Sequence, residues 1–269
     1  MQLLRNSIFV PQEGNKEMDK MKGFKNRLSQ KRAVKVITGI NNFDIENIKK
    51  VIVAAEQGNA SAVDVAAREN IIYIAKELTD LPVFVSSIIP EELAMAAEKG
   101  ADALEIGNFD ALYAQGLKIS AQDVLEITKK TVELVGNDIF LSVTIPGNID
   151  INEQISLAKE LELLGVDLIQ SEGAPIASTD SNELTLTHKA HISITNTMEL
   201  VKNTKIPVMT ASGITPTTAG LSFAAGASAV GVGSCINKLN SVLEMTKSVR
   251  AVVAAANCCS CREELTTCN

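Results

Sequence analysis

Two kinds of segment alternate along most of this chain. Short runs of valine, isoleucine, leucine and alanine are separated by longer stretches in which apolar residues recur every three or four positions, as in "DIENIKKVIVAAEQG" (44–58). The short runs indicate buried strands, and the longer stretches indicate amphipathic helices that cover them. This alternation predicts repeated strand–helix units around a parallel sheet.

Eight strands are predicted in this way. They lie at residues 34–40, 62–67, 83–88, 103–108, 139–145, 168–173, 207–213 and 229–234. Four of the helical stretches end in a glycine, the residue that a left-handed helix end prefers, at Gly58, Gly100, Gly165 and Gly226. Eight units in one chain favour a closed (β/α)8 barrel, the TIM barrel, which typically takes about 250 residues. An open, doubly wound sheet is the alternative, since it needs no eighth strand.

The barrel is expected to form a single domain over residues 29–256. An N-terminal extension precedes it at 1–28, and a tail at 257–269 holds four of the five cysteines, namely Cys258, Cys259, Cys261 and Cys268. A disulfide framework would spread its cysteines across the fold, so their crowding indicates a reducing compartment. Neither histidine is near them in the sequence, so we expect a solvated tail and no metal site.

Charge and hydropathy argue against several classes of partner. The formal net charge is −7 and the isoelectric point is about 5.1, which disfavours nucleic acid and anionic membranes. No apolar run approaches the roughly 20 residues that cross a bilayer. The first thirty residues mix acidic and basic side chains without an apolar core, unlike a secretory signal. We therefore expect a soluble protein that stays in the compartment where it is made.

Strand alternation also predicts a polar cluster inside the barrel. Because helices cover the outside, the outward strand residues must be apolar, and Lys35, Asp64 and Glu105 must then face inward. A buried charge without a partner costs several kcal/mol, so Lys35 is expected to pair with Asp64, Glu105 or both. The same register adds Gln170 to this interior cluster and puts Glu172 above it, near the mouth.

Three residues, Lys35, Glu172 and His188, are candidates for proton transfer. A desolvated lysine can act as a nucleophile or a base, whereas carboxylates beside Lys35 would hold it protonated in a structural role, and both readings stay open. Glu172 is the better-placed acid or base because it is nearer the mouth. His188 falls in a long polar segment, 174–190, that is expected to form a loop or lid, where it either carries a proton or lies on the surface.

Small residues at the ends of predicted strands seven and eight indicate an anion site. Ser212-Gly213 and Gly233-Ser234 would present bare main-chain N–H groups at the face where barrel enzymes often bind phosphate. Thr215-Pro216 is then expected to begin a helix, and Ser234 to cap a short one. The alternative is that these glycines only make tight turns, but their recurrence at two neighbouring strand ends favours a phosphate group.

Four segments carry a resemblance to a known family. They are "VKVITGINNFD" (34–44), "SAVDVAA" (61–67), "ADALEIGNFD" (101–110) and "MTASGITPTTAGLSFAAGASAVGVGS" (209–234). Together they resemble hypothetical chloroplast reading frame twenty-three, a family of plastid and cyanobacterial proteins, over about residues 30 to 250. The resemblance implies an aldolase-type barrel and a location in the chloroplast stroma or the cyanobacterial cytoplasm. It implies no particular reaction and no catalytic residues.

Three functions are compatible with these features. The first is a lyase, isomerase or aldolase-like enzyme that holds a small phosphorylated metabolite and uses Glu172, with His188 or Lys35, to move protons. The second is an oxidoreductase of the nitronate monooxygenase type, with the phosphate of FMN in the same pocket. The third is a non-catalytic ligand-binding or regulatory barrel.

Overall fold

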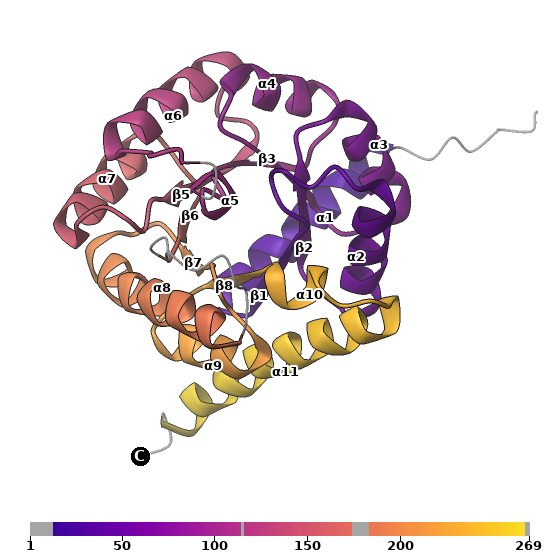
Figure 1. Ribbon diagram of the computed structural model, residues 1–269. Helices are drawn as coiled ribbons and strands as arrows, with labels where there is room; N and C mark the ends of the chain where they lie inside the picture. Colours follow the sequence, from indigo (N-terminus) through magenta and orange to yellow (C-terminus); the bar gives the residue numbers. More distant parts are fainter. Residues whose placement is uncertain (1–12, 114–115, 174–182, 267–269) are drawn as a thin grey trace, which may run out of the picture.

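Eight parallel strands close into a barrel inside a ring of helices (Figure 1). The computed structural model describes residues 13–113, 116–173 and 183–266. Each strand pairs with the next along the chain, and the last pairs with the first, with Lys35 opposite Gly231. This closure confirms the (β/α)8 barrel and is incompatible with an open sheet, which would leave two edge strands unpaired.

All eight predicted strands are present. They are β1 (Ala33–Ile37), β2 (Ala62–Ala66), β3 (Val83–Ser87), β4 (Ala103–Ile106), β5 (Phe140–Ile145), β6 (Leu168–Ser171), β7 (Val208–Thr210) and β8 (Ala229–Val232). Most end before the predicted limit: β1 stops three residues short of residue 40. The chain leaves the ladder where φ turns positive, as it does at Gly39, Asn108 and Ser212. These turns build the loops at the carboxyl ends of the strands.

Helices follow the strands in alternation. They are α1 (Glu13–Ser29), α2 (Ile45–Gln57), α3 (Glu69–Leu78), α4 (Pro90–Glu98), α5 (Asp110–Tyr113), α6 (Ala121–Val135), α7 (Ile151–Leu163), α8 (Glu183–Asn203), α9 (Pro216–Ala224), α10 (Ser234–Asn237) and α11 (Val242–Thr266). Thr215 precedes α9 with Pro216 at its start, as predicted. The amino-terminal cap of α10 differs from the prediction: Gly233 is the capping residue, and Ser234 is the first residue of the helix.

Helix α1 closes the amino-terminal end of the barrel. Its Phe24 is 1% exposed and packs edge-to-face on Phe84 and Phe140, with ring centroids 5.1 and 5.8 Å away. Leu28 is buried in the same cluster, and α1 crosses behind the strands in Figure 1. The boundary expected after residue 28 is therefore no packing boundary, because the supposed extension contributes to the interior of the barrel.

Helix α11 crosses the second expected boundary, between residues 256 and 257. It continues to Thr266, so most of the predicted tail is helical rather than loose. Cys258 is a free, exposed cysteine on this helix. The side chains of Cys259 and Cys261, and all of Cys268, lie outside what the structure describes.

None of the described helices has an apolar stretch long enough to cross a membrane.

Candidate active site

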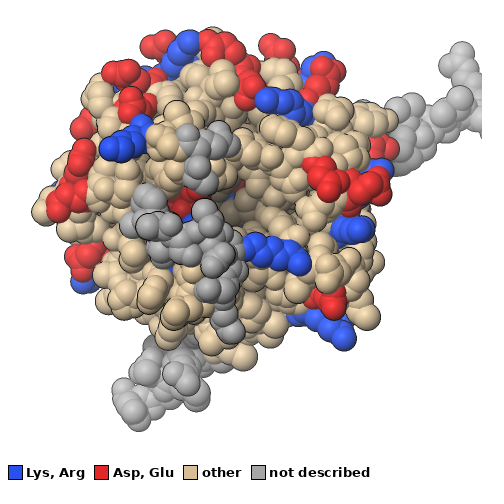
Figure 2. All heavy atoms as spheres, viewed as in Figure 1, with Lys and Arg blue, Asp and Glu red and all other residues tan. Residues whose placement is uncertain are grey.

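A pocket opens at the carboxyl ends of the strands. It encloses about 690 Å³, including its solvent-open mouth, and draws its lining from the ends of β1, β4, β6, β7 and β8 and from α8. Figure 2 shows the hollow at the centre of this face, with acidic atoms visible beside it. A hollow at this end of a (β/α)8 barrel is where such proteins bind ligands.

Both predicted phosphate-binding segments line this pocket. Ser212-Gly213 follows β7 and Gly233-Ser234 follows β8, and the two strands are hydrogen-bonded neighbours with Met209 opposite Ala229. No bulky side chain from either segment fills the space between them. The structure thus brings together two segments about 20 residues apart in the sequence, because adjacent parallel strands end at the same rim of a barrel.

The two glycines differ in what their surroundings require. Gly213 has φ +75°, and a Cβ there would collide with the Leu186 carbonyl oxygen and lie 2.8 Å from the Ala190 nitrogen, so it also permits α8 to approach closely. Gly233 has φ −129°, and a Cβ there would lie 3.2 Å from the Ile37 carbonyl oxygen. Backbone conformation and tight packing are therefore sufficient to explain why residue 213 is a glycine. Packing alone explains the glycine at position 233 less completely.

Glu172 projects into the pocket just beyond β6. It is 3% exposed, its Oε1 accepts a hydrogen bond of 2.8 Å from the Asp110 main-chain N–H, and its Oε2 has no hydrogen-bond partner among the described residues. Burial first, and the nearby Asp110 carboxylate second, raise the pKa of Glu172 well above its ordinary value. Lys189 opposes this shift without cancelling it. Glu172 thus keeps its proton at a pH at which an exposed glutamate has lost it, and such a group suits general acid catalysis.

Asp110, Ser212 and Lys189 form a polar cluster at the mouth. Ser212 Oγ donates to Asp110 Oδ2 over 2.5 Å, and Lys189 Nζ lies 3.3 Å from Asp110 Oδ1. Lys189 is the one cationic side chain among the described residues that line the pocket. Sequence reasoning missed both charged residues. Asp110 had a usable signal, since it follows a predicted strand end, whereas Lys189 was hidden in the segment expected to form a loop.

His188 does not reach the pocket. Of the expected loop at 174–190, residues 174–182 lie outside the described structure, and residues 183–190 form the first turns of α8. His188 and His191 are both exposed on this helix. The prediction of a loop was wrong over residues 183–190, where the buried positions are Thr185 and Ala190 and no apolar periodicity marks the helix.

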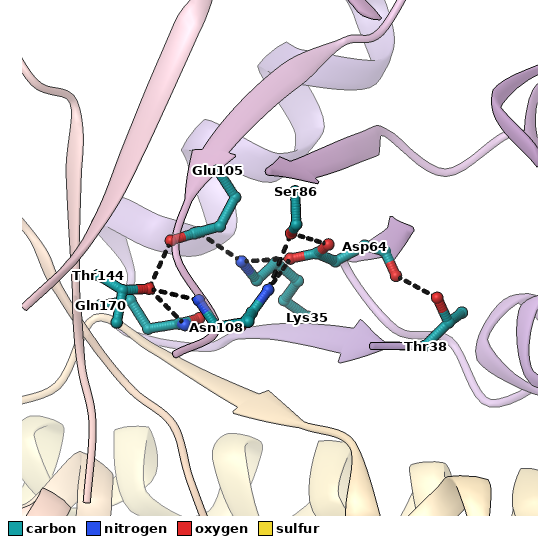
Figure 3. Close-up of polar contacts among 8 residues, drawn as sticks. All are labelled: Lys35, Thr38, Asp64, Ser86, Glu105, Asn108, Thr144 and Gln170. Atoms are coloured by element: carbon teal, nitrogen blue, oxygen red, sulfur yellow. Dashed lines mark hydrogen bonds and ion pairs between the residues drawn. The ribbon is translucent and has the colours of Figure 1, made fainter. Parts of the chain in front are cut away.

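Lys35 lies beneath the pocket inside a buried ion cluster (Figure 3). Its Nζ is 2.7 Å from Glu105 Oε2 and 3.0 Å from Asp64 Oδ2, and all three side chains are fully buried, so both expected ion pairs form. Burial alone would lower the pKa of Lys35, but the two carboxylates outweigh it and raise the pKa. Lys35 is not among the described residues that line the pocket. A protonated lysine at this depth is suited to the structural role.

Within the described ranges, no three His, Cys, Asp or Glu side chains converge in a way that could hold a metal ion.

The protonation of Glu172 predicts a specific pH dependence of stability. Between its ordinary value of 4.5 and its raised pKa in the folded protein, the unfolded chain has released a proton that the folded chain keeps. The free energy of unfolding should therefore fall as the pH rises through this window, and Glu172→Gln should remove that fall. We therefore expect the melting temperature of Glu172→Gln to increase relative to that of the parent as the pH rises, which thermal unfolding measures.

The exposed Glu153 on α7 provides the matched control. The melting temperature of Glu153→Gln should stay parallel to that of the parent across the pH range. If the melting temperatures of Glu172→Gln and the parent run parallel across the pH range, the assignment of a raised pKa to Glu172 is wrong.

Comparison with solved structures shows where this fold recurs. Thiamine phosphate pyrophosphorylase from Pyrococcus furiosus is 17% identical, with a TM-score of 0.54 over 85% of this chain and 98% of that one. (S)-3-O-geranylgeranylglyceryl phosphate synthase from Thermoplasma acidophilum, solved with its substrate sn-glycerol-1-phosphate, is 17% identical, with a TM-score of 0.60 over 87% of this chain and 97% of that one. At these identities the likeness shows a common fold alone.

Sequence comparison identifies the family. The protein of Cyanophora paradoxa called "Uncharacterized protein ycf23" is 40% identical, and the match covers 86% of this chain and 96% of the relative. The protein of the same description from Pyropia yezoensis is 39% identical, and the match covers 84% of this chain and 83% of the relative. The family model described as "Protein of unknown function (DUF561)" matches residues 18–261, which include most of α1 as well as the barrel. The chain therefore belongs to the ycf23 family, DUF561.

Proposed function

We propose that this protein is an enzyme, a lyase or an isomerase, that acts on a small phosphorylated metabolite. The observation that carries the proposal is that Ser212-Gly213 and Gly233-Ser234 line the same pocket as the buried acid Glu172. A phosphate held between the ends of β7 and β8 would leave the rest of a small substrate beside Glu172. The solved structures named above support this by analogy of fold only.

The phosphate would bind mainly to main-chain N–H groups. Ser212 and Gly213 have φ values of 69° and 75°, and consecutive residues in such turn conformations can form a concave anion site. Lys189 adds positive charge at the mouth, and its ion pair offsets the charge that Asp110 would otherwise present to the phosphate.

Glu172 would carry the proton transfer. In its protonated state it donates from Oε2 to a substrate oxygen, and the resulting carboxylate takes a proton back from the substrate. Of the three candidates from the sequence, Glu172 alone lines the pocket among the described residues. His188 is exposed on α8, and Lys35 lies below the pocket. We also propose a location in the chloroplast stroma or the cyanobacterial cytoplasm, in keeping with the algal relatives.

Ligand-induced stabilisation tests the phosphate site. A ligand at a hundred times its dissociation constant should raise the free energy of unfolding by about 2.7 kcal/mol, which thermal unfolding detects. Inorganic phosphate and a panel of phosphorylated metabolites are the probes. Ser234→Asp, which puts a negative charge on an exposed residue of the pocket, should weaken phosphate binding about tenfold or more.

Ser156→Asp, at an exposed position on α7 outside the pocket lining, is the control and should bind as the parent does. Absence of stabilisation by every phosphorylated probe at millimolar concentration would overturn the phosphate site. A flavin absorption band in the freshly purified protein would instead favour the FMN oxidoreductase. A ligand that binds tightly and is never converted would favour the non-catalytic barrel.

A further inference from the structure

The floor of the pocket contains a buried hydrogen-bond acceptor that no donor in the described part of the chain satisfies. Gln170 is 1% exposed and lines the pocket, and its side-chain carbonyl oxygen Oε1 has no hydrogen-bond partner among the described residues. Leaving such an atom unpaired is costly, and most buried polar groups in native proteins are paired. An unpaired acceptor that faces a ligand pocket therefore points to a donor on the ligand.

The hydrogen-bond network sets the orientation of the Gln170 amide (Figure 3). Its Nε2 donates to Thr144 Oγ1 and to Asn108 Oδ1, each over 2.9 Å, so both amide hydrogens are used. Thr144 must accept here, because its own hydroxyl donates to Glu105 Oε1 over 2.8 Å. The nitrogen of Gln170 thus faces the network, and its oxygen faces the pocket.

The buried ion cluster maintains this direction from two sides. Lys35 donates to Glu105 and holds it as the acceptor for Thr144. On the other side, Asn108 Nδ2 donates to Ser86 Oγ over 2.8 Å, which leaves the Asn108 carbonyl oxygen to accept from Gln170. A rotated Gln170 amide would set its oxygen against two oxygens that need donors. Lys35 is, in this sense, a positioning residue for the pocket floor.

Gly231, on the neighbouring wall of the pocket, lies beside this oxygen. A Cβ at Gly231 would lie 3.4 Å from Gln170 Oε1, 3.1 Å from Ala211 Cβ and 2.9 Å from Ile37 Cδ1. Its φ is outside the left-handed region, so the backbone itself does not require glycine at this strand position. Close packing of Ile37 and Ala211 therefore favours glycine here, and a methyl group at this position would lie in contact with the oxygen of Gln170.

We propose that Gln170 Oε1 accepts a hydrogen bond from a hydroxyl group of the ligand, so that the pocket selects a hydroxylated monophosphate, a polyol or sugar phosphate, over one with an apolar chain. This inference rests on the phosphate site of the proposed function. A neutral hydroxyl fits better than an ammonium group because the carboxylates near the pocket are already occupied: Asp110 by Lys189, and Glu172 by its own proton.

Inorganic phosphate and three esters of similar size test the selection. The esters are glycerol phosphate, n-propyl phosphate and 3-aminopropyl phosphate, and each probe is titrated by calorimetry into the full-length protein. Glycerol phosphate should bind about ten- to a hundredfold more tightly than n-propyl phosphate, because only glycerol phosphate satisfies the buried oxygen. The aminopropyl compound should gain no comparable advantage.

Two variants assign the preference to Gln170. Gly231→Ala puts a methyl group against the oxygen, displaces only the end of the Ile37 side chain and keeps the hydrogen bonds of Gln170. Gln170→Met removes the oxygen at nearly constant volume, together with the two hydrogen bonds that Nε2 donates. In each, the preference for glycerol phosphate should fall to within about twofold, while binding of inorganic phosphate stays as in the parent. Gly23→Ala, on α1 with open space around it, is the control and should leave both affinities unchanged.

The outcomes separate this inference from the proposed function. If inorganic phosphate and all three esters fail to bind, the phosphate site is wrong and this inference falls with it. If the phosphates bind but the glycerol and propyl esters are equivalent, or the aminopropyl ester binds most tightly, hydroxyl selection is wrong and the phosphate site stands. Unchanged selectivity in a folded Gly231→Ala protein would also overturn the role of Gln170.

Discussion

Replacement of Lys35 by methionine should lower the free energy of unfolding by about 3–5 kcal/mol. The variant removes one cation from between two fully buried carboxylates, Glu105 at 2.7 Å and Asp64 at 3.0 Å. It leaves those carboxylates in the barrel without a counter-charge, and it deprives Glu105 of a hydrogen-bond donor. Equilibrium urea unfolding of the parent and the variant measures the difference.

Two controls sharpen this experiment. Lys49→Met breaks an exposed ion pair with Glu46 on α2 and should change stability by no more than about 0.5 kcal/mol. Combining Lys35→Met with Asp64→Asn and Glu105→Gln removes the charges of this cluster and should recover part of the loss. A Lys35→Met protein that is as stable as the parent but inactive would contradict the structural role and support the catalytic one.

Phe24→Ala should destabilise the protein by a similar amount, about 3–5 kcal/mol. Phe24 is 1% exposed and plugs the amino-terminal end of the barrel between Phe84 and Phe140. Truncation to alanine would open a cavity that the strands on all sides cannot collapse to fill, because their hydrogen-bonded ladder closes the barrel. Chemical denaturation gives the measurement, with an unchanged far-ultraviolet circular dichroism spectrum as the check that the variant folds.

Tyr73→Ala, at a site 66% exposed on α3, removes an aromatic ring of similar size and should cost little. A Phe24→Ala variant within about 1 kcal/mol of the parent would indicate that α1 is dispensable, as the boundary expected after residue 28 implies. A large loss would establish that the barrel includes α1.

Particular residues show how far the sequence was informative. The inward direction of Lys35, Asp64 and Glu105 followed from strand alternation, because a side chain must point either to the covering helices or to the barrel interior. The meeting of Ser212-Gly213 with Gly233-Ser234 followed from the same reasoning, since neighbouring parallel strands end at one rim. Both expectations need only two facts: side chains alternate between the two faces of a strand, and the sheet is closed.

Elements without a clear apolar pattern were predicted poorly. The first turns of helix α8, residues 183–190, bury Thr185 as well as Ala190, so no run of apolar positions marked them as helical in the sequence. Helix α1 is polar on most of its length in the sequence, and Phe24 and Leu28 are the residues of its described side chains that are buried in the barrel cluster. In both cases tertiary contacts outweigh local preference.

Repeated hydrophobic runs by themselves determined the number of strands, the class of fold and the set of side chains that turn inward, because these depend on alternation along the chain. The tertiary structure alone decided that Lys189 and Asp110 reach the mouth, that Lys35 lies below the pocket, and that the Gln170 oxygen is left unpaired. Those outcomes depend on distances between segments 60 or more residues apart, such as Gln170 and Asn108. Only closure of the barrel sets such distances, and no local pattern encodes them.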